Sequence, residues 1–151
     1  PVSCTGVGLH TGVESTITFH PAEENFGIKF MRNDQNDQII TPDIDNVVDL
    51  TRGTTIEEHG VRVHTTEHVM SACAGMGINN LLIELNSKEP PVMDGSSKDF
   101  VYALKMGGII EQKANICTRI SYKRKRPLLY QIYICLPYRD TRDTLPLVLI
   151  F

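Results

Sequence analysis

The chain has 151 residues, of which 41% are hydrophobic and 22% are charged. This composition is typical of a globular protein and excludes a disordered or fibrous one, and the length suffices for a domain with a buried core. No apolar run reaches the ~20 residues that cross a bilayer, and no basic region followed by an apolar one opens the chain, so the sequence predicts neither a transmembrane segment nor a secretory signal.

The formal net charge of −3 hides an asymmetry along the chain. Residues 1–118 carry eight basic and 16 acidic residues, whereas residues 119–151 carry seven basic and two acidic ones. Such a shift indicates a boundary, and we expect one domain over 1–114 and the start of a truncated or divergent second domain over 115–151. The acidic first part argues against nucleic acid as a partner. We expect the basic run 123–126 to form a solvated turn between two strands; the alternative is that it binds phosphate groups.

The first part of the chain predicts strands joined by turns. Residues 3–12 contain three glycines and no helical period, which indicates the end of a strand and a tight turn. Alternating side chains predict a half-buried strand over Glu14–Phe19, and Gly27–Met31 predicts a second one. Residues 39–48 favour an extended, irregular segment that Pro42 breaks.

A hairpin precedes the first predicted helix. His59-Gly60 separates two short β-prone segments, 54–57 and 61–64, and is typical of a two-residue hairpin turn. Apolar side chains then recur at spacings of three and four, which predicts an amphipathic helix. Thr65 or Thr66 is the expected N-cap. The apolar positions are Val69, Ala72, Cys73 and Met76.

The remaining pattern predicts one strand and one further helix. Residues 80–85 are apolar and β-prone, as expected for a buried strand. Ser96 with Asp99 resembles a capping box at the start of the second helix, with Asp in place of the usual Glu, and Gly107-Gly108 ends that helix. Strands followed by a helix, a strand and a helix favour an α+β fold: a two-layer sandwich of one β-sheet with two helices on one face.

The segment from His64 to His68, HTTEH, carries the chemistry. Glu67 and His68 fall in the first turn of the expected helix, where the helix dipole favours an ionised carboxylate and a neutral imidazole. A neutral imidazole can bind a metal ion, and adjacent helical residues diverge by about 100°, so Glu67 could act as a base beside a metal held by His68. The alternative is simple capping by solvated polar residues, which is the commoner role of such a pair.

The other histidines and the cysteines give weaker signals. A metal site formed by His64 and His68 together would need both on the helix, as in zincins, but the hairpin pattern leaves His64 on a strand. His10 is flanked by glycines that would admit a ligand; alternatively it is a turn residue bonded to nearby backbone. The cysteines form no C-x-x-C pair and are expected to be reduced thiols of a cytoplasmic protein; they are Cys4, Cys73, Cys117 and Cys135.

Three motifs, taken in order, are similar to those of one enzyme family. They are GVGLHTG at 6–12, HTTEH with a small-residue helix and GMGINN at 64–80, and EPPVMDGSS at 89–97. Over residues 3–113 the chain resembles the first domain of the zinc-dependent UDP-3-O-acyl-N-acetylglucosamine deacetylases of lipid A biosynthesis. The order and spacing of three motifs make the similarity more specific than any single motif.

The resemblance implies an enzyme of the Gram-negative cytoplasm that removes the N-acetyl group of its UDP-sugar substrate, the committed step of lipid A synthesis. It implies two α+β domains with the active site between them. Glu67 would be the catalytic base, His68 one ligand of Zn2+, and His10 a further catalytic residue close to them. Residues 52–54 match, more weakly, a segment that lines the acyl-chain entrance. Some family members are fused to a 3-hydroxyacyl carrier-protein dehydratase, and the full-length protein could carry such a fusion.

The resemblance also implies ligands that this sequence lacks. In the family, a His and an Asp in an H-x-x-x-D arrangement, and a histidine that acts as general acid, come from the second domain, whereas this chain has no histidine after His68. A catalytic zinc site needs about three protein ligands. We therefore expect a complete first domain that is inactive alone. The alternative is a non-catalytic α+β module with no metal site of its own.

Overall fold

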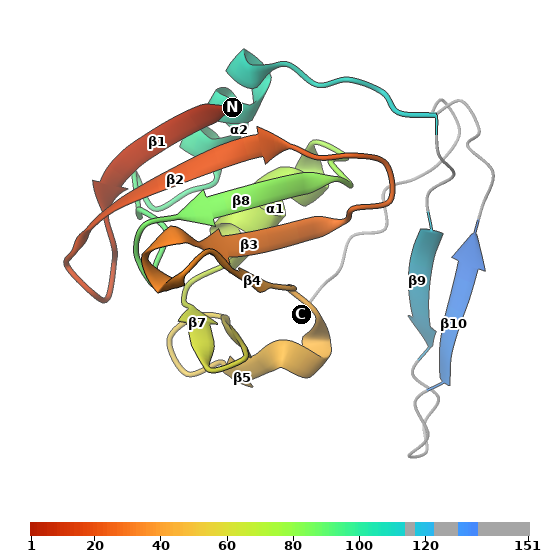
Figure 1. The fold of residues 1–151 in the computed structure, drawn as a ribbon, viewed down its shortest axis with the longest axis horizontal. Coiled ribbons are helices and arrows are strands. Elements are labelled where there is room, and N and C mark those ends of the chain that lie inside the picture. The colour runs from red at the N-terminus through yellow and green to blue at the C-terminus, as the bar shows by residue number, and fades with distance from the viewer. Residues whose placement is uncertain (114–116, 123–129, 136–151) are drawn as a thin grey trace. The chain divides into compact units, whose positions relative to one another are not determined.

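The computed structural model describes residues 1–113, 117–122 and 130–135. The chain divides into two compact units, Pro1–Glu111 and Gln112–Phe151. The first unit contains a five-stranded sheet, a three-stranded sheet and two α-helices (Figure 1). Within the described part of the chain, no helix has the length and the apolar composition that crossing a membrane requires.

The larger sheet is mixed, and the last of its strands in sequence lies at its centre. The order is β1-β2-β8-β3-β4. All neighbours are antiparallel except β3 and β8, which run parallel with Phe30 opposite Ile83. The strands are β1 (Val2–Val7), β2 (Glu14–Pro21), β3 (Ile28–Arg32), β4 (Gln38–Ile40) and β8 (Leu81–Leu85).

Alternation of side chains gives this sheet one apolar and one polar face. Ile17 of β2 and Ile83 of β8 are fully buried on the apolar face. On the opposite face, hydroxyl groups pair across β1 and β2, and the oxygens of Ser3 and Thr18 lie 2.9 Å apart. The half-buried strand and the buried strand predicted from sequence are both confirmed.

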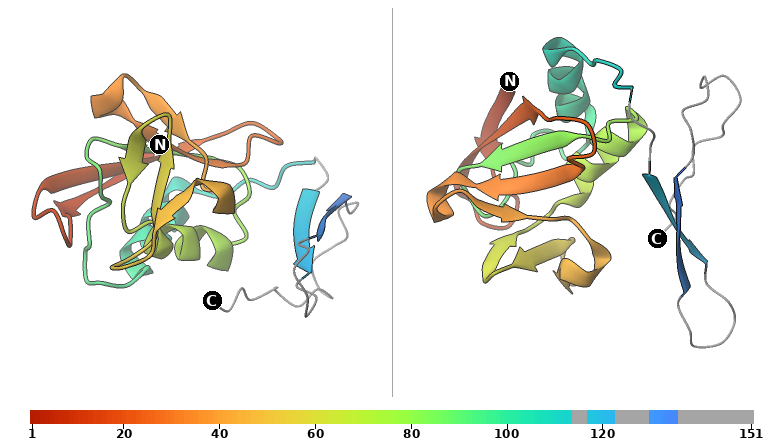
Figure 2. Two further views of the ribbon diagram at one scale, coloured as in Figure 1. Left: turned by 90° about the horizontal axis from the view of Figure 1, so that it is seen from below. Right: turned by 45° about the vertical axis from the view of Figure 1, so that its right-hand side comes forward.

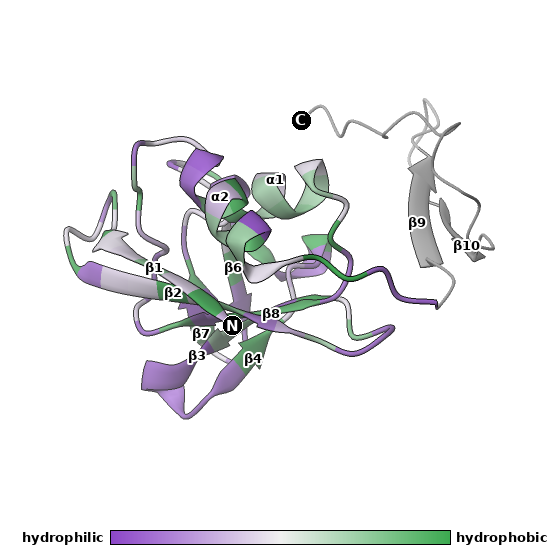
Figure 3. Ribbon diagram, turned by 90° about the horizontal axis from the view of Figure 1, so that it is seen from above, coloured by the Kyte–Doolittle hydropathy of each residue, from purple (hydrophilic) through white to green (hydrophobic). Residues whose placement is uncertain are grey.

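Two helices cover the apolar face: α1 (Glu67–Gly75) and α2 (Lys98–Gly107). Figures 2 and 3 show them side by side on one side of the sheet, and they contact each other. The ring of Phe100 in α2 packs edge-on against that of Phe19 in β2, with centroids 6.3 Å apart. The predicted α+β fold, with two helices on one face of a sheet, is therefore confirmed.

A smaller sheet, of which the sequence predicted the hairpin but not the third strand, is inserted between β4 and α1. Its order is β5-β6-β7, with β5 (Val47–Asp49), β6 (Thr55–Glu58) and β7 (Val61–Val63). The predicted hairpin between β6 and β7 is confirmed, because His59 and Gly60 have positive φ angles of 52° and 78°, as a type I′ turn requires. Buried Ile56 and Val63 join this sheet to the main core.

Short 3-10 helices occupy two of the connections. They are η1 (Asn33–Gln35), between β3 and β4, and η2 (Ile44–Asn46), which leads into β5. Residues 39–48, expected to be irregular, thus contain the end of β4, η2 and the start of β5.

Both α-helices begin near the predicted residues, and the N-cap of α1 is Thr66, one of the two predicted residues. Thr66 precedes α1, yet its hydroxyl donates to the carbonyl oxygen of Thr54 at 3.2 Å instead of capping the helix. The predicted capping box between Ser96 and Asp99 is wrong, because Ser97 is the residue at the N-cap and makes no side-chain cap bond. The Ser96 hydroxyl donates to the Asp94 carboxylate at 2.6 Å and accepts the N–H of Lys98, the first residue of α2, at 3.1 Å.

The second unit contains a hairpin of β9 (Cys117–Tyr122) and β10 (Tyr130–Cys135). The strands are antiparallel, with Tyr122 opposite Tyr130. The basic run 123–126, predicted to be a turn between two strands, lies outside the described residues. The domain boundary at residue 114 stays a prediction.

Candidate active site

Glu67 and His68 open α1, directly after a tightly bent connection from β7. Thr65, just before the helix, has a φ of 53°, which is unfavourable for a β-branched residue and persists only where surrounding contacts hold it. Those contacts are hydrogen bonds to the segment after β8. The His64 N–H donates to the carbonyl oxygen of Lys88 at 2.8 Å, and the Thr65 hydroxyl donates to Glu89 at 2.7 Å.

The Glu67 carboxylate is anchored on one side by the segment that precedes β6. Its Oε2 accepts the N–H of Thr54 at 2.9 Å. Gly53 lies against the other oxygen, since a Cβ atom added there would lie 2.9 Å from Oε1. The Thr54 carbonyl oxygen also accepts the N–H of Thr66 at 3.2 Å, so residues 52–54 are attached to the first turn of α1.

His68 is half-buried, and its side chain has no hydrogen-bond partner among the described residues. Its ring nitrogens are therefore free to meet a ligand, which fits one position of a zinc site. Within the ranges that the structure describes, no group of three or more His, Cys, Asp or Glu side chains could hold a metal ion. A metal at His68 would thus need further ligands from outside those ranges.

His10 lies in the loop between β1 and β2 and approaches the same segment from the other side. Its Nε2 is 3.0 Å from the carbonyl oxygen of Arg52. The loop is closed by hydrogen bonds between Gly8 and Val13 and between Gly12 and Gly8, and Gly12 has a φ of 64°. The structure therefore brings His10 and Glu67 to opposite ends of the tripeptide Arg52-Gly53-Thr54.

Glu89 is a site residue that sequence reasoning missed. Its side chain is fully buried, and it accepts hydrogen bonds from the N–H groups of His10 and Thr11 at 3.0 and 2.9 Å as well as from Thr65. Burial alone would raise the pKa of Glu89, but these hydrogen bonds together hold the pKa below its ordinary value. The sequence offered one signal for this residue: Glu89 is acidic and stands between a predicted buried strand and two prolines.

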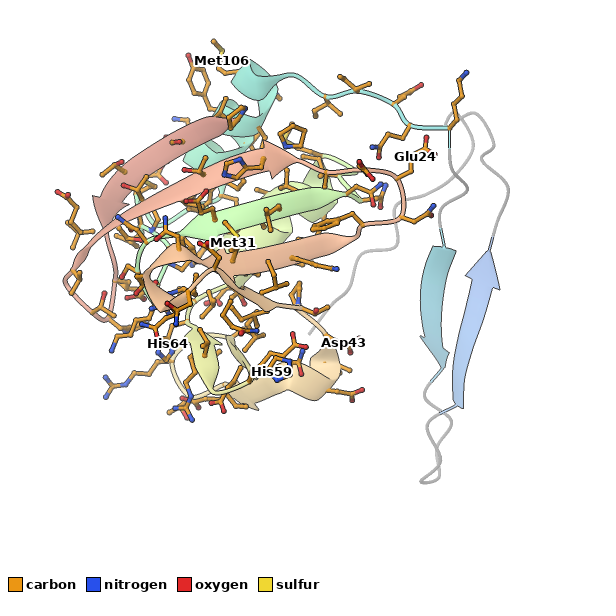
Figure 4. The ribbon with its side chains drawn as sticks, viewed as in Figure 1. Glu24, Met31, Asp43, His59, His64 and Met106 are labelled. Carbon is orange, nitrogen blue, oxygen red and sulfur yellow. The ribbon has the colours of Figure 1, made fainter. Side chains whose placement is uncertain are left out.

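A pocket of about 520 Å³ opens beside His10 and the residue 52–54 segment. His64, at the end of β7 (Figure 4), lines this pocket, although the sequence left it outside the site. Its Nδ1 is 3.0 Å from the Thr55 hydroxyl, and burial, with Lys88 nearby, lowers its pKa. The pocket is lined by His10, Thr11, Val13, Asp49, Thr51, Arg52, Gly53, Thr55, His64, Thr65 and Lys88.

Comparison with known proteins finds one family over most of the chain. The sequence profile of "LpxC: UDP-3-O-acyl N-acetylglycosamine deacetylase" matches residues 1–141. A relative named bifunctional enzyme LpxC/FabZ, from Chlorobaculum tepidum, is 56% identical over 112 residues, which are 74% of this chain and 24% of the relative.

Two relatives named UDP-3-O-acyl-N-acetylglucosamine deacetylase match in the same way. That of Neisseria meningitidis is 48% identical over 118 residues, covering 75% of this chain and 38% of the relative. That of Cellvibrio japonicus is 46% identical over 115 residues, covering 76% and 38%. The chain thus spans about a quarter to two-fifths of the length of these relatives, and it belongs to the UDP-3-O-acyl N-acetylglycosamine deacetylase family.

Proposed function

We propose that this chain is the N-terminal part of a zinc-dependent UDP-3-O-acyl-N-acetylglucosamine deacetylase that works in the cytoplasm of a Gram-negative bacterium, at the committed step of lipid A synthesis. The observation that carries the proposal is the pairing of Glu67 with His68 in the first turn of α1, in a chain of the deacetylase family. Because the chain covers 24–38% of its relatives, the activity is proposed for a protein that contains it.

His68 would supply one ligand to the metal. A zinc ion at such a site provides Lewis acidity toward a carbonyl oxygen and toward water. The ring nitrogens of His68 have no hydrogen-bond partner among the described residues, so one of them can bind the metal. The remaining ligands would come from parts of the longer protein outside the described residues.

Glu67 would take the proton from the attacking water. The Thr54 N–H orients the carboxylate through Oε2, which leaves Oε1 to accept the proton. His10 would act at the same site from the opposite end of the tripeptide 52–54, whose carbonyl its ring contacts. A relative named as a bifunctional LpxC/FabZ enzyme supports the possibility that the full-length protein carries a fused dehydratase.

The test is a chimera in which this chain replaces the matched N-terminal segment of the Neisseria meningitidis deacetylase. We expect the chimera to release acetate from UDP-3-O-acyl-N-acetylglucosamine and to lose this activity on chelation of the metal. The His68→Ala variant should lose bound metal, whereas Glu67→Ala should retain metal and lose rate by at least about a hundredfold. The matched control is Glu58→Gln, a carboxylate in the small sheet that contacts Thr41.

The 151-residue chain alone should show no turnover. A folded chimera without activity would support the alternative of a non-catalytic module. Unchanged turnover in the Glu67→Ala chimera would remove the assigned base, and unchanged metal content in His68→Ala would remove the assigned ligand.

A further inference from the structure

We propose that Glu89 is a positioning residue that holds the His10 loop against the segment 52–54 and so fixes His10 relative to Glu67. The catalytic part of this inference rests on the proposed deacetylase function. Glu89 is fully buried, and so it acts through the groups that it binds and not by touching substrate.

The Glu89 carboxylate accepts hydrogen bonds from two other parts of the chain. From the β1–β2 loop, the N–H of His10 lies 3.2 and 3.0 Å from the two carboxylate oxygens, and the N–H of Thr11 lies 2.9 Å from Oε2. From the connection to α1, the Thr65 hydroxyl donates to Oε1 at 2.7 Å. Hydrogen bonds to a charged acceptor are shorter and stronger than neutral ones, and a buried one is costly to lose.

The loop is built to admit this carboxylate. A Cβ atom at Gly8 would lie 2.7 Å from Oε2 of Glu89 and 2.3 Å from the Thr11 hydroxyl oxygen, so a side chain at Gly8 would displace the contact. Glutamine at position 89 has the same shape but carries no charge, so its single acceptor oxygen would bind the N–H groups of His10 and Thr11 more weakly than the carboxylate does. The site therefore favours a charged carboxylate over a neutral side chain of the same shape.

The hydrogen bonds of Glu89 connect the two proposed catalytic groups, His10 and Glu67. Glu89 fixes the His10 backbone, the His10 ring lies 3.0 Å from the Arg52 carbonyl oxygen, and two residues later the Thr54 N–H holds Glu67. Thr65, which Glu89 also binds, stands directly before the N-cap of α1. Loss of the Glu89 hydrogen bonds should therefore free the His10 ring while Glu67 stays on the Thr54 N–H and the proposed metal ligand, His68, stays in place.

The first test needs no catalysis and uses NMR on the 151-residue chain. In the Glu89→Gln variant we expect the His10 and Thr11 amides to exchange with solvent at least about tenfold faster than in the wild type. The matched control is Glu84→Gln, on the polar face of β8, where the carboxylate binds His20 and Asn33. It should leave both amides unchanged.

A wild-type measurement keeps the proposal testable if Glu89→Gln does not fold. Acid titration of the Glu89 carboxyl, followed by its own carbon signal, should move the His10 and Thr11 amide signals with the same midpoint. The proposal would be overturned if the His10 and Thr11 amide signals did not move in this titration. It would also be overturned if these amides exchanged no faster in the folded Glu89→Gln chain than in the wild type.

The second test uses the chimera and asks whether Glu89 acts through His10. Glu89→Gln should lower kcat by about tenfold or more with little change in KM, and Glu89→Asp should recover part of the loss. In a His10→Ala background, Glu89→Gln should lower kcat little further. Additive losses would show a merely structural role and overturn the proposal. An inactive chimera with the expected amide behaviour would instead count against the proposed deacetylase function.

Discussion

Gly53 is the position where one added methyl group tests the geometry around Glu67. Its φ is 148°, in a region that side chains disfavour, and a Cβ atom there would lie 2.9 Å from Oε1 of Glu67 and 3.5 Å from the Thr65 hydroxyl oxygen. The Gly53→Ala substitution therefore does two things: it strains the backbone, and it pushes the Glu67 carboxylate away from the N–H of Thr54.

The two effects have separate magnitudes. A non-glycine residue in this backbone region costs of order 1–3 kcal/mol. Loss of the partly buried hydrogen bond between Thr54 and Glu67 costs about 1 kcal/mol more. We expect Gly53→Ala to lower the free energy of unfolding by about 2–4 kcal/mol. Gly60→Ala, with a φ of 78° and no atom within 4 Å of the added Cβ, carries only the backbone cost of about 1–2 kcal/mol.

Urea unfolding of the 151-residue chain measures both effects, with Gly53→Ala made in the wild type and in a Glu67→Ala background. The cost of Gly53→Ala should be about 1 kcal/mol smaller where Glu67 is absent, because the carboxylate is no longer displaced. An equal cost in the two backgrounds, or a loss no larger than that of Gly60→Ala, would refute the assigned contact.

Three further predictions concern the core, the acid stability and a buried thiol. Phe100→Ala should lower the free energy of unfolding, measured in urea, by about 3–5 kcal/mol. Met106, near the end of α2, is 68% exposed (Figure 4), so Met106→Ala should change that free energy by less than about 0.5 kcal/mol. Because the pKa of Glu89 is lowered in the fold, its contribution to stability is present above the unfolded-state value of about 4.3 and is lost as the pH falls through the lower folded-state value. Glu89→Gln should therefore flatten the acid limb of the unfolding free energy plotted against pH, and an unaltered slope would contradict this linkage. Burial raises the pKa of Cys73 to about 12, so peptide mapping after alkylation at neutral pH should find it unmodified in the folded chain and modified in urea.

The local patterns predicted most of the elements because each depends on near neighbours. Alternation predicted β2, an apolar β-prone run predicted β8, spacing of three and four predicted α1, and the pair His59-Gly60 predicted the hairpin. The third strand of the small sheet, β5, was missed because it is three residues long, too short for alternation to be seen. Thr66 is the N-cap residue of α1, as predicted, but it makes no side-chain cap bond because its hydroxyl donates to the carbonyl oxygen of Thr54. The predicted capping box of α2 was wrong, because Ser97 and not Ser96 stands at the N-cap.

The candidate site could be predicted only where its residues adjoin in sequence. Glu67 and His68 are neighbours at the start of a helix, and their motif directed attention to them. Glu89 is 79 residues from His10, and no local pattern relates the two. Its importance depends on burial and on donors from distant loops, which only the assembled fold reveals. The roles assigned to Glu67, His68 and His10 stay predictions.

The central place of β8 has a consequence for synthesis on the ribosome. β2 and β3, its neighbours on either side, are translated about 60 and about 50 residues earlier, so both leave the exit tunnel with an unsatisfied strand edge. The sheet closes only when Leu81–Leu85 inserts between them, and by then the nascent chain already carries Glu67 and His68. We therefore expect stalled chains that end before Leu81 to be bound by chaperones, and cotranslational folding to occur in one late step.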